Sequence, residues 1–353
     1  MDLLNQFRSH VVIRNKYPES IDSENSVLIY DRNLESYRKD YEELDEFIDS
    51  FDYSVSFKGG EDLKSFAEFP KNIEKIIKVW PEPIKRSQNL VVLGGGSLGD
   101  FGGFVASILK RGVQLIHIPS TWLSAMDSAH GGKNALNYKS LKNQIGTFYP
   151  ANKVYIIRDL LEMAPDDLLE QSFGELIKMA LIGDSKFFKE ITHEKREAKD
   201  FVWRFLKFCI EDKYHVVLQD PFETKKIRQT LNFGHSLGHA FESYFKWSHG
   251  DSVLQGIFFA LEWSRSRGDL SDNLHKQILK VISEKFDRIP ANELPWYKKP
   301  SHKAFTKLIN ADKKIAISGK LNFVFLKNIG KASVKPVEVD ELIEEAKRQN
   351  WLK

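Results

Sequence analysis

The sequence has very little cysteine and no long apolar run. Cys209 is the only cysteine among 353 residues, so neither an intramolecular disulfide nor a cysteine-rich zinc site can form, and a reducing, cytoplasmic compartment fits. No apolar run approaches the roughly 18–20 residues of a membrane-spanning helix, so we expect no membrane protein. The first residues lack a basic segment followed by a long apolar core, so we expect no secretory signal.

The chain also has little net charge. Its 52 Lys and Arg residues nearly balance 49 Asp and Glu residues, which leaves a formal charge of +3. Interspersed charges of both signs argue against a dedicated nucleic-acid-binding protein, although lysines could still gather around an anionic substrate. With 42% apolar and 29% charged residues, the composition is that of an ordinary globular protein.

The two halves of the chain differ in their pattern of apolar residues, and the length suggests about two domains. The first half alternates nearly continuous Val/Ile/Leu runs with amphipathic stretches, which predicts a parallel sheet covered on both faces. We expect strands at 27–31, 55–59, 90–96, 113–120 and 154–159, and a helix over 34–51. The second half has helical patterns at 165–183, 201–220 and 252–266, and a β-hairpin signal at 315–326. The sequence predicts an α/β protein, with a nucleotide-binding parallel α/β domain at 1–160 and a mainly α-helical domain at 161–353.

Glycines 94–96 and 99 follow the central expected strand and precede a helix. Glycine lets the backbone approach a ligand, and a helix N-terminus offers N–H groups and a positive dipole to phosphate. The spacing is not GxGxxG, so the loop fits either a phosphate cradle or a tight strand-to-helix turn. Asp31 and Asn33 follow the strand at 27–31, where ribose hydroxyls are often bound, although alone they also fit a turn.

Three histidines, His235, His239 and His249, lie within 15 residues. The first two are four residues apart and share one helix face, so both could bind a metal, or one could bind it while the other faces a substrate. Glu175 lies on another apolar helical pattern, with Lys178 on the same side. A carboxylate and two imidazoles suit zinc or a similar divalent ion, whereas each residue alone would fit a hydrogen-bonded surface position. We therefore expect the helical domain to bind a metal, but not as a zinc peptidase, because HExxH is missing.

Basic and short polar residues gather in three further segments. Lysines and arginines bind phosphate or carboxylate, but each one alone also fits a solvated surface. The candidates for anion binding are Asp127, Lys133, Lys142 and Asn143 around glycines 131–132, then Lys213, Arg228 and Asn232, and the DKK run at 312–314.

These motifs together resemble the 3-dehydroquinate synthase family, in order from about residue 27 to residue 330. The resemblance rests on GGGSLGDFGGFVAS, RGVQLIHIPSTWLSAMDSAHGGKNALN, LKNQIGTFY, GELIKMALI and RQTLNFGHSLGHAFES…HGDSV. No single motif is specific, but the ordered set is. The wider group, the sugar-phosphate cyclases, shares the fold, NAD and a metal, and differs in substrate.

The resemblance implies NAD and a divalent metal, zinc or cobalt, as cofactors. It places at NAD the residues Asp31, Asn33, Glu61, Lys64, Gly95, Gly96, Ser97, Gly99, Asp100, Ser120, Thr121 and Lys142. It places Glu175, His235 and His249 at the metal. It places at the substrate's hydroxyls and carboxylate Asp127, Lys178, Lys213, Glu223 and Arg228, and at its phosphate Lys133, Asn143, Asn232, His239 and a lysine of the DKK run, for which we take Lys313. Arg111 matches a phosphate contact from the other subunit, which implies a homodimer.

The chain departs from the family pattern at a few positions. The segment from His235 to His249 is a few residues shorter than expected, and Asp251 replaces the usual Glu of HGE. One extra residue lies between Glu223 and Arg228, while His130 and Met163 stand where other residue types are usual. These departures concern loops and surrounding residues more than the expected ligands.

The activity implied is that of a lyase of the shikimate pathway, which serves aromatic amino-acid biosynthesis. It cyclises 3-deoxy-D-arabino-heptulosonate 7-phosphate to 3-dehydroquinate, eliminates phosphate and regenerates NAD⁺. The alternatives are another cyclase that makes a cyclitol from sedoheptulose 7-phosphate or glucose 6-phosphate, a metal-dependent polyol dehydrogenase, and a catalytically silent NAD-binding protein. Lys213 and Arg228 favour a substrate that carries a carboxylate, and the complete set of expected metal ligands argues against a silent protein.

Overall fold

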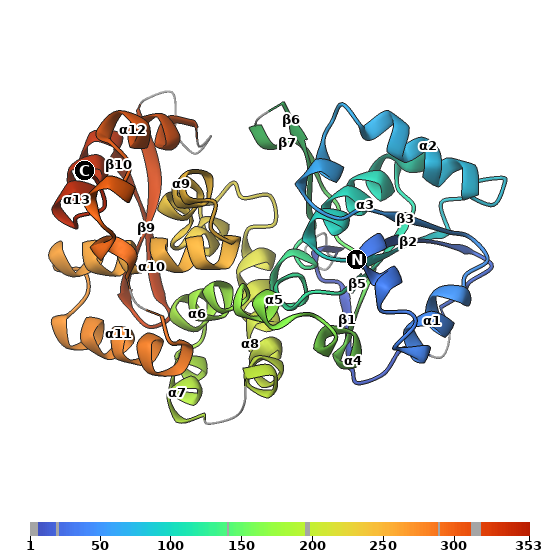
Figure 1. Cartoon of the computed structure of the whole chain (residues 1–353), viewed down its shortest axis with the longest axis horizontal. Helices are drawn as coiled ribbons and strands as arrows, with labels where there is room; N and C mark the ends of the chain where they lie inside the picture. Colours follow the sequence, from blue (N-terminus) through green and yellow to red (C-terminus); the bar gives the residue numbers. More distant parts are fainter. Residues whose placement is uncertain (1–5, 19–20, 140, 195–197, 289, 312–318) are drawn as a thin grey trace. The chain divides into compact units, whose positions relative to one another are not determined.

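The computed structural model describes residues 6–18, 21–139, 141–194, 198–288, 290–311 and 319–353. The chain forms two compact units, Met1–Leu169 and Glu170–Lys353 (Figure 1). None of the described helices is long and apolar enough to cross a membrane. The first unit contains the parallel sheet, and the second is mostly helical, so the expected fold class is confirmed.

Within the described residues, a six-stranded parallel sheet forms the centre of the first unit, in the order β1-β8-β5-β4-β2-β3. Strands β2 (Ser26–Asp31), β4 (Asn89–Gly94), β5 (Gln114–Pro119) and β8 (Lys153–Ile157) are largely buried, as their continuous apolar runs predict. The edge strands are β1 (His10–Arg14) and β3 (Ser54–Phe57). The strand β1 was not expected, because this short, partly exposed segment lacks a clear apolar pattern.

Helices cover both faces of this sheet. On one face, α1 (Glu42–Asp49) inserts Leu44, Phe47 and Ile48 into a core cluster with residues of β2, β4, β5 and β8. On the other face, α3 (Gly96–Ile108) lies so close that a Cβ on Gly102 would be 2.6 Å from Cγ2 of Val92. The chain connects β3 to β4 through α2 (Phe69–Val79).

The strand order reverses between β2 and β4, because β3 lies beyond β2 whereas β5 lies beyond β4. The connections that follow β2 and β4 therefore leave the carboxyl edge of the sheet in opposite directions. In open α/β sheets, ligands bind at such a switch point. This topology places the expected nucleotide-binding loop at the end of β4.

The single helix expected over 34–51 is wrong. The structure has a short 3-10 helix, η2 (Arg32–Ser36), then a turn, and then α1. The turn lets Arg38 reach back to Asp45 and Asp49, one helical turn apart on α1. The antiparallel hairpin of β6 (Lys133–Tyr138) and β7 (Leu141–Phe148) was also not expected.

The second unit is built around α10 (His249–Ser266), whose residues from Ser252 to Leu261 are all buried. It packs against α9, α6, α11 and β9. The remaining helices are α4 (Arg158–Glu162, in the first unit), α5 (Asp166–Glu170), α6 (Phe173–Ile182), α7 (Ser185–His193), α8 (Ala198–Gln219), α9 (His235–Phe245), α11 (Asp272–Phe286), α12 (His302–Ala311) and α13 (Val339–Arg348).

Two expectations for this unit need correction. Residues 315–318 of the hairpin expected at 315–326 lie outside the described residues. The structure shows a hairpin of β9 (Lys320–Asn328) and β10 (Lys331–Glu338), which turns at Gly330 with φ +72°. The helix expected over 165–183 is interrupted between α5 and α6, where the carbonyl of Gln171 lies against the start of α10.

Candidate functional site

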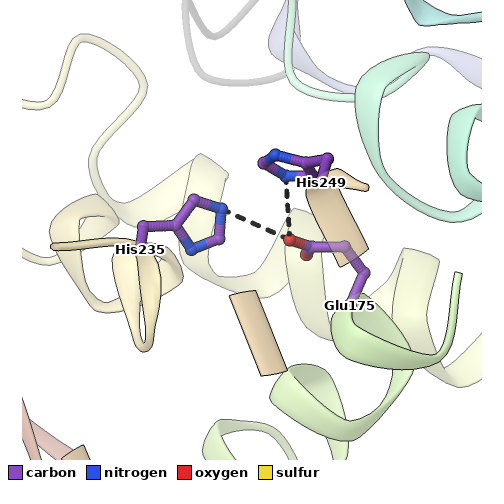
Figure 2. A group of neighbouring side chains, drawn as sticks. All are labelled: Glu175, His235 and His249. Atoms are coloured by element: carbon purple, nitrogen blue, oxygen red, sulfur yellow. Dashed lines mark ion pairs between the residues drawn. The ribbon is translucent and has the colours of Figure 1, made fainter. Parts of the chain in front are cut away.

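Glu175, His235 and His249 converge from three helices of the second unit. Glu175 lies in the first turn of α6, and the two histidines are the first residues of α9 and α10. Nε2 of His235 is 3.3 Å from Oε1 of Glu175, and Nε2 of His249 is 3.6 Å from the same oxygen (Figure 2). The three candidate ligand atoms lie within 4.8 Å of one another. This is a donor set for a divalent cation such as zinc.

Glycines beside these residues allow the helices to meet. A Cβ on Gly174 would lie 2.1 Å from the carbonyl oxygen of Gly250, so α6 and α10 touch backbone to backbone. Gly174 precedes Glu175 and Gly250 follows His249, so this contact brings the carboxylate to the imidazole. Gly234 precedes His235 and adopts φ +80°, a left-handed conformation that favours glycine.

The carboxylate of Glu175 is almost completely buried, with 1% of its side chain exposed. Neither of its oxygens accepts a well-formed hydrogen bond from the described part of the chain, although His235, His249 and Lys178 lie at ion-pair distance. Burial would raise the pKa of Glu175, but Lys178 and the two imidazoles hold it well below its usual value. A buried anion of this kind requires compensating positive charge, which a bound cation would supply.

Both imidazoles direct Nδ1 away from Glu175. Nδ1 of His235 is 3.2 Å from the carbonyl oxygen of Phe233, and Nδ1 of His249 is 3.1 Å from Oε2 of Glu242. Each Nδ1 can therefore donate its hydrogen, which leaves the Nε2 lone pair for a metal. Burial and Lys178 lower the pKa of His235 to about 3, so this ring is neutral.

His249 differs in its protonation. Burial opposes its charge, but Glu175 and Glu242 outweigh this and raise the pKa of His249 to about 9. A metal at Nε2 would displace that proton. His239 lies beside this group, with its ring centroid 5.5 Å from that of His235 and 6.3 Å from that of His249. Among the described residues, the convergent ligand atoms are those of Glu175, His235 and His249.

A loop that precedes α9 carries two of the expected substrate residues, Glu223 and Arg228. The buried carboxylate of Asp220 organises it by accepting from the backbone N–H groups of Thr224, at 2.8 Å, and Arg228, at 3.1 Å. Glu223 and Lys226 in this loop adopt left-handed backbone conformations, with φ +58° and +65°. Asp220 was not expected from the sequence, because an aspartate in a turn has no distinctive pattern.

The other expected substrate residues of this unit are mostly buried. Arg228 is 3% exposed and donates from Nη1 to the carbonyl of Pro221 at 2.6 Å. Arg228 is the first residue of the short 3-10 helix η6 (Arg228–Asn232), and Asn232, another expected substrate residue, is its last. Lys213 on α8 and Lys178 on α6 are 7% and 2% exposed. Lys313 lies outside the described residues.

Most of the residues expected to bind NAD follow adjacent strands of the first unit. Asp31 ends β2, Gly95 and Gly96 follow β4, and Thr121 follows β5. Gly95 is the N-cap of α3, so the first N–H groups of this helix lie at the carboxyl edge of the sheet. This arrangement fits a phosphate cradle. Packing also restricts the loop, because a Cβ on Gly96 would lie 2.9 Å from Oγ of Ser128.

Local hydrogen bonds connect the other members of this set. Oδ1 of Asp31 accepts from the backbone N–H of Asn33 at 3.0 Å, as expected for a turn. Oγ of Ser97 accepts from the backbone N–H of Gly60 at 2.9 Å. The backbone N–H of Ser120 donates to the carbonyl of Gly94 at 3.0 Å, and Gly99 packs against His117.

Lys64 connects α3 to the β6–β7 hairpin. It is 4% exposed, and its Nζ donates to Oδ2 of Asp100 at 2.6 Å and to Oδ1 of Asn143 at 2.7 Å. Asn137 completes the connection, because it accepts from the backbone of Asn143 and donates to Oε2 of Glu61, both at 2.8 Å. The structure thus brings together Glu61, Lys64, Asp100 and Asn143. Asn137 carried no signal in the sequence.

The remaining expected residues of the first unit lie on other elements. Asp127 belongs to a short π-helix, η5 (Ser124–Ser128), and π-helical turns are frequent at functional sites. Nε2 of the buried His130 lies 2.8 Å from the carbonyl oxygen of Ala125 in this turn. Lys133 and Lys142 are exposed on the hairpin, and Arg111 is exposed at the end of the 3-10 helix η4 (Leu109–Arg111).

Known proteins share both the fold and the sequence pattern. The chain is 32% identical to 3-dehydroquinate synthase of Picrophilus torridus over 302 residues, which cover 82% of this chain and 85% of that protein. A 2-deoxy-scyllo-inosose synthase crystallised with carbaglucose-6-phosphate, NAD⁺ and Co²⁺ has a TM-score of 0.79 at 23% identity, covering 93% of this chain and 90% of that one.

A second solved structure has a similar fold. The 2-epi-5-epi-valiolone synthase of Streptomyces hygroscopicus subsp. jinggangensis, with NAD⁺ and Zn²⁺ bound, has a TM-score of 0.80 at 18% identity, covering 99% of this chain and 98% of that one. Family models described as 3-dehydroquinate synthase N-terminal and C-terminal match residues 54–171 and 172–315. These matches span most of the sequence, and the chain therefore belongs to the 3-dehydroquinate synthase family.

Proposed function

We propose that this protein is a 3-dehydroquinate synthase, which converts 3-deoxy-D-arabino-heptulosonate 7-phosphate to 3-dehydroquinate with loss of phosphate. The observation that carries this proposal is the convergence of Glu175, His235 and His249 in a chain of this family. The reaction belongs to the shikimate pathway. The substrate is a small sugar acid phosphate, and the protein acts as a phosphate-eliminating lyase.

NAD and a divalent metal are the proposed cofactors. Structural neighbours that hold NAD⁺ with Co²⁺ or Zn²⁺ support this assignment. The first unit would bind NAD at the carboxyl edge of its sheet, and the second would bind the metal through Glu175, His235 and His249. When bound, NAD⁺ accepts and returns a hydride, and the metal polarises a substrate oxygen.

The buried residues of the second unit would orient the substrate. Arg228 presents a planar guanidinium that can hold a carboxylate in bidentate fashion, and Lys213 adds a second positive charge. Lys178 keeps a positive charge beside Glu175 in a site from which water is largely excluded. Glu223 would hold a substrate hydroxyl, and Asn232 and His239 would contact the phosphate.

The first unit and the DKK run would supply the other substrate contacts. Asp127 would hold a substrate hydroxyl. The proposed phosphate contacts are Lys133, Asn143 and Lys313. Such residues act by fixing position and charge, because the hydride chemistry belongs to the cofactor.

We further propose a cytoplasmic homodimer. The exposed guanidinium of Arg111 is available to a second copy of the chain, and it would complete the phosphate site of that copy. Sedimentation of the purified wild type and of Arg111→Ala tests the oligomeric state, and we expect a dimer in both cases. Steady-state kinetics test the phosphate contact, and we expect a raised KM for the phosphorylated substrate in the variant. A monomeric wild-type protein would contradict both statements.

One assay distinguishes the candidate activities. The protein is incubated with the seven-carbon acid phosphate, a catalytic amount of NAD⁺ and Zn²⁺, while phosphate release and NADH absorbance are followed. We expect phosphate far in excess of the NAD⁺ supplied, with no accumulation of NADH. NADH formed one-for-one with product would instead indicate a polyol dehydrogenase, and turnover of only sedoheptulose 7-phosphate or glucose 6-phosphate would indicate a cyclitol synthase. A catalytically silent protein would produce neither signal.

A further inference from the structure

We infer that Glu242 is a positioning residue of the proposed metal site. By contacting one ring nitrogen of His249, Glu242 determines which nitrogen faces the metal. Oε2 of Glu242 lies 3.1 Å from Nδ1 of His249, while Nε2 of the same ring faces Oε1 of Glu175 at 3.6 Å. The imidazole is thus held between two carboxylates. This inference rests on the metal site of the proposed function, and it assigns a role to a residue that does not contact the metal.

The position of Glu242 follows from the helix on which it lies. It comes seven residues after His235 and three after His239 on α9, so all three share one helix face. The helix ends at Phe245, and Lys246 reverses the chain in a left-handed conformation with φ +59°. Because α10 begins at His249 after this short connection, its first residue returns to the last turns of α9. The short connection between Phe245 and His249 therefore places the imidazole beside Glu242.

The backbone of His249 is fixed independently of Glu242. Oγ of Ser248 accepts from the backbone N–H of Asp251 at 3.1 Å and contacts Oδ2 of Asp251 at 2.7 Å, which caps α10. What remains free is the rotation and the tautomer of the ring. With 34% of its side chain exposed, His249 is less restrained by packing than His235, which has 12% exposed.

Both histidines need a hydrogen-bond acceptor at Nδ1 in order to present Nε2 to a metal, and each has a different acceptor. An imidazole that binds a metal through Nε2 carries its hydrogen on Nδ1, and an acceptor at Nδ1 fixes that tautomer and the ring plane. For His235 the acceptor is the backbone carbonyl of Phe233. For His249 it is the side chain of Glu242, which can be removed by substitution. Loss of such an acceptor typically weakens metal affinity by about 10–100-fold.

The experiment measures metal binding rather than turnover. Full-length protein is stripped with a chelator and titrated with Co²⁺, whose visible absorption reports the bound ion. We expect Glu242→Ala to bind Co²⁺ roughly 10–100-fold more weakly than wild type. Glu242→Gln should recover most of the affinity, because its amide oxygen still accepts from Nδ1. The matched control is Glu284→Ala, which removes an exposed carboxylate on α11 that pairs with Lys280, and it should bind as wild type does.

A second measurement reports the tautomer directly. Long-range ¹H–¹⁵N spectra of the Zn²⁺-loaded wild type should show His249 protonated at Nδ1, and those of Glu242→Ala should show a mixture or loss of this state. If the alanine variant does not fold, Glu242→Met fills a similar volume without an acceptor and is tested in its place.

The outcomes separate this inference from the proposed function. Wild-type Co²⁺ affinity and an unchanged tautomer in Glu242→Ala, or in Glu242→Met, would overturn the role of Glu242 while leaving the metal site intact. A glutamine variant as weak as the alanine variant would also overturn it. A wild-type protein that binds no Co²⁺ would instead contradict the metal site of the proposed function.

Discussion

Lys178 and Glu175 form an ion pair one helical turn apart on α6, with only 2% and 1% of their side chains exposed. Their mutual attraction compensates for the loss of hydration that each charge suffers on burial. Glu175 also faces two imidazoles. The charge balance of the proposed metal site therefore already includes one fixed cation before a metal binds.

Substitution of Lys178 by Met should destabilise the metal-free protein. We expect the free energy of unfolding to fall by up to about 3–5 kcal/mol, because removal of Lys178 leaves the buried carboxylate of Glu175 with only the two imidazoles to balance its charge. Zn²⁺ should recover part of this loss, since it binds the same carboxylate in the folded state. Denaturant unfolding of wild type and variant, in chelator and in excess Zn²⁺, measures both effects. A variant as stable as wild type in chelator would contradict the structural role of this pair.

Removal of the metal should abolish activity, and Zn²⁺ or Co²⁺ should restore it. His235→Ala should lose tightly bound metal, because His235 supplies one of three convergent ligand atoms. Its first unit should stay folded, since His235 belongs to the second unit. Metal analysis of the purified variant, with circular dichroism to follow folding, tests this prediction. Full metal occupancy in His235→Ala would contradict the ligand assignment.

Arg228→Ala should chiefly impair substrates that carry a carboxylate. Loss of a charged, bidentate contact typically costs about 2–4 kcal/mol, which corresponds to roughly 30- to 1000-fold in kcat/KM. The comparison uses the seven-carbon acid phosphate and sedoheptulose 7-phosphate, which lacks the carboxylate. Arg228→Lys serves as the control, since it keeps the charge but not the bidentate geometry. Equal losses for both substrates would show that Arg228 does not recognise the carboxylate.

Sequence alone predicted the parts of the molecule that depend on local pattern. Continuous apolar runs predicted β2, β4, β5 and β8. Three histidines and a distant glutamate predicted a metal site, and the structure brings Glu175, His235 and His249 together. Tertiary contacts determined the features that the local pattern did not predict, such as the places where helices are interrupted. The helix expected over 34–51 is interrupted where Arg38 turns back to α1.

Single polar residues were harder to predict than patterns. Asp220, Asn137 and Glu242 contact neighbours through a few hydrogen bonds whose partners only the fold brings close. No spacing rule marks a residue of this kind, because its partner can lie anywhere in the chain. Their roles therefore became visible only in the structure.

His117 should make the protein less stable in mild acid. It lies on β5, 6% exposed, and burial lowers the pKa of His117 from 6.5 to about 4. The folded state therefore keeps this ring neutral between these values, whereas the unfolded chain takes up a proton below 6.5. The stabilisation is complete above pH 6.5 and is lost as the pH falls toward 4, by up to about 1.4 kcal/mol per pH unit.

Denaturant unfolding at pH 7 and pH 5 measures this effect as the difference between wild type and His117→Gln. The variant should lose less stability than wild type over this interval, because glutamine does not titrate. The exposed His302 on α12 offers a control, as His302→Gln should leave the wild-type difference unchanged. Identical losses in wild type and His117→Gln would show that His117 is not responsible.

Lys64 donates one hydrogen bond to Asp100 and another to Asn143, and this sharing has a thermodynamic consequence. A ligand that draws Lys64 away from Asn143 breaks the hydrogen bond between them. The amide of Asn143 then has a different set of partners when a second ligand binds to it. Coupling of this kind is reciprocal: the factor by which the first ligand alters the affinity of the second equals the factor by which the second alters that of the first. Under the proposed function, in which Lys64 contacts NAD and Asn143 contacts the substrate phosphate, the affinities for these two ligands should therefore be linked through the ammonium group of Lys64.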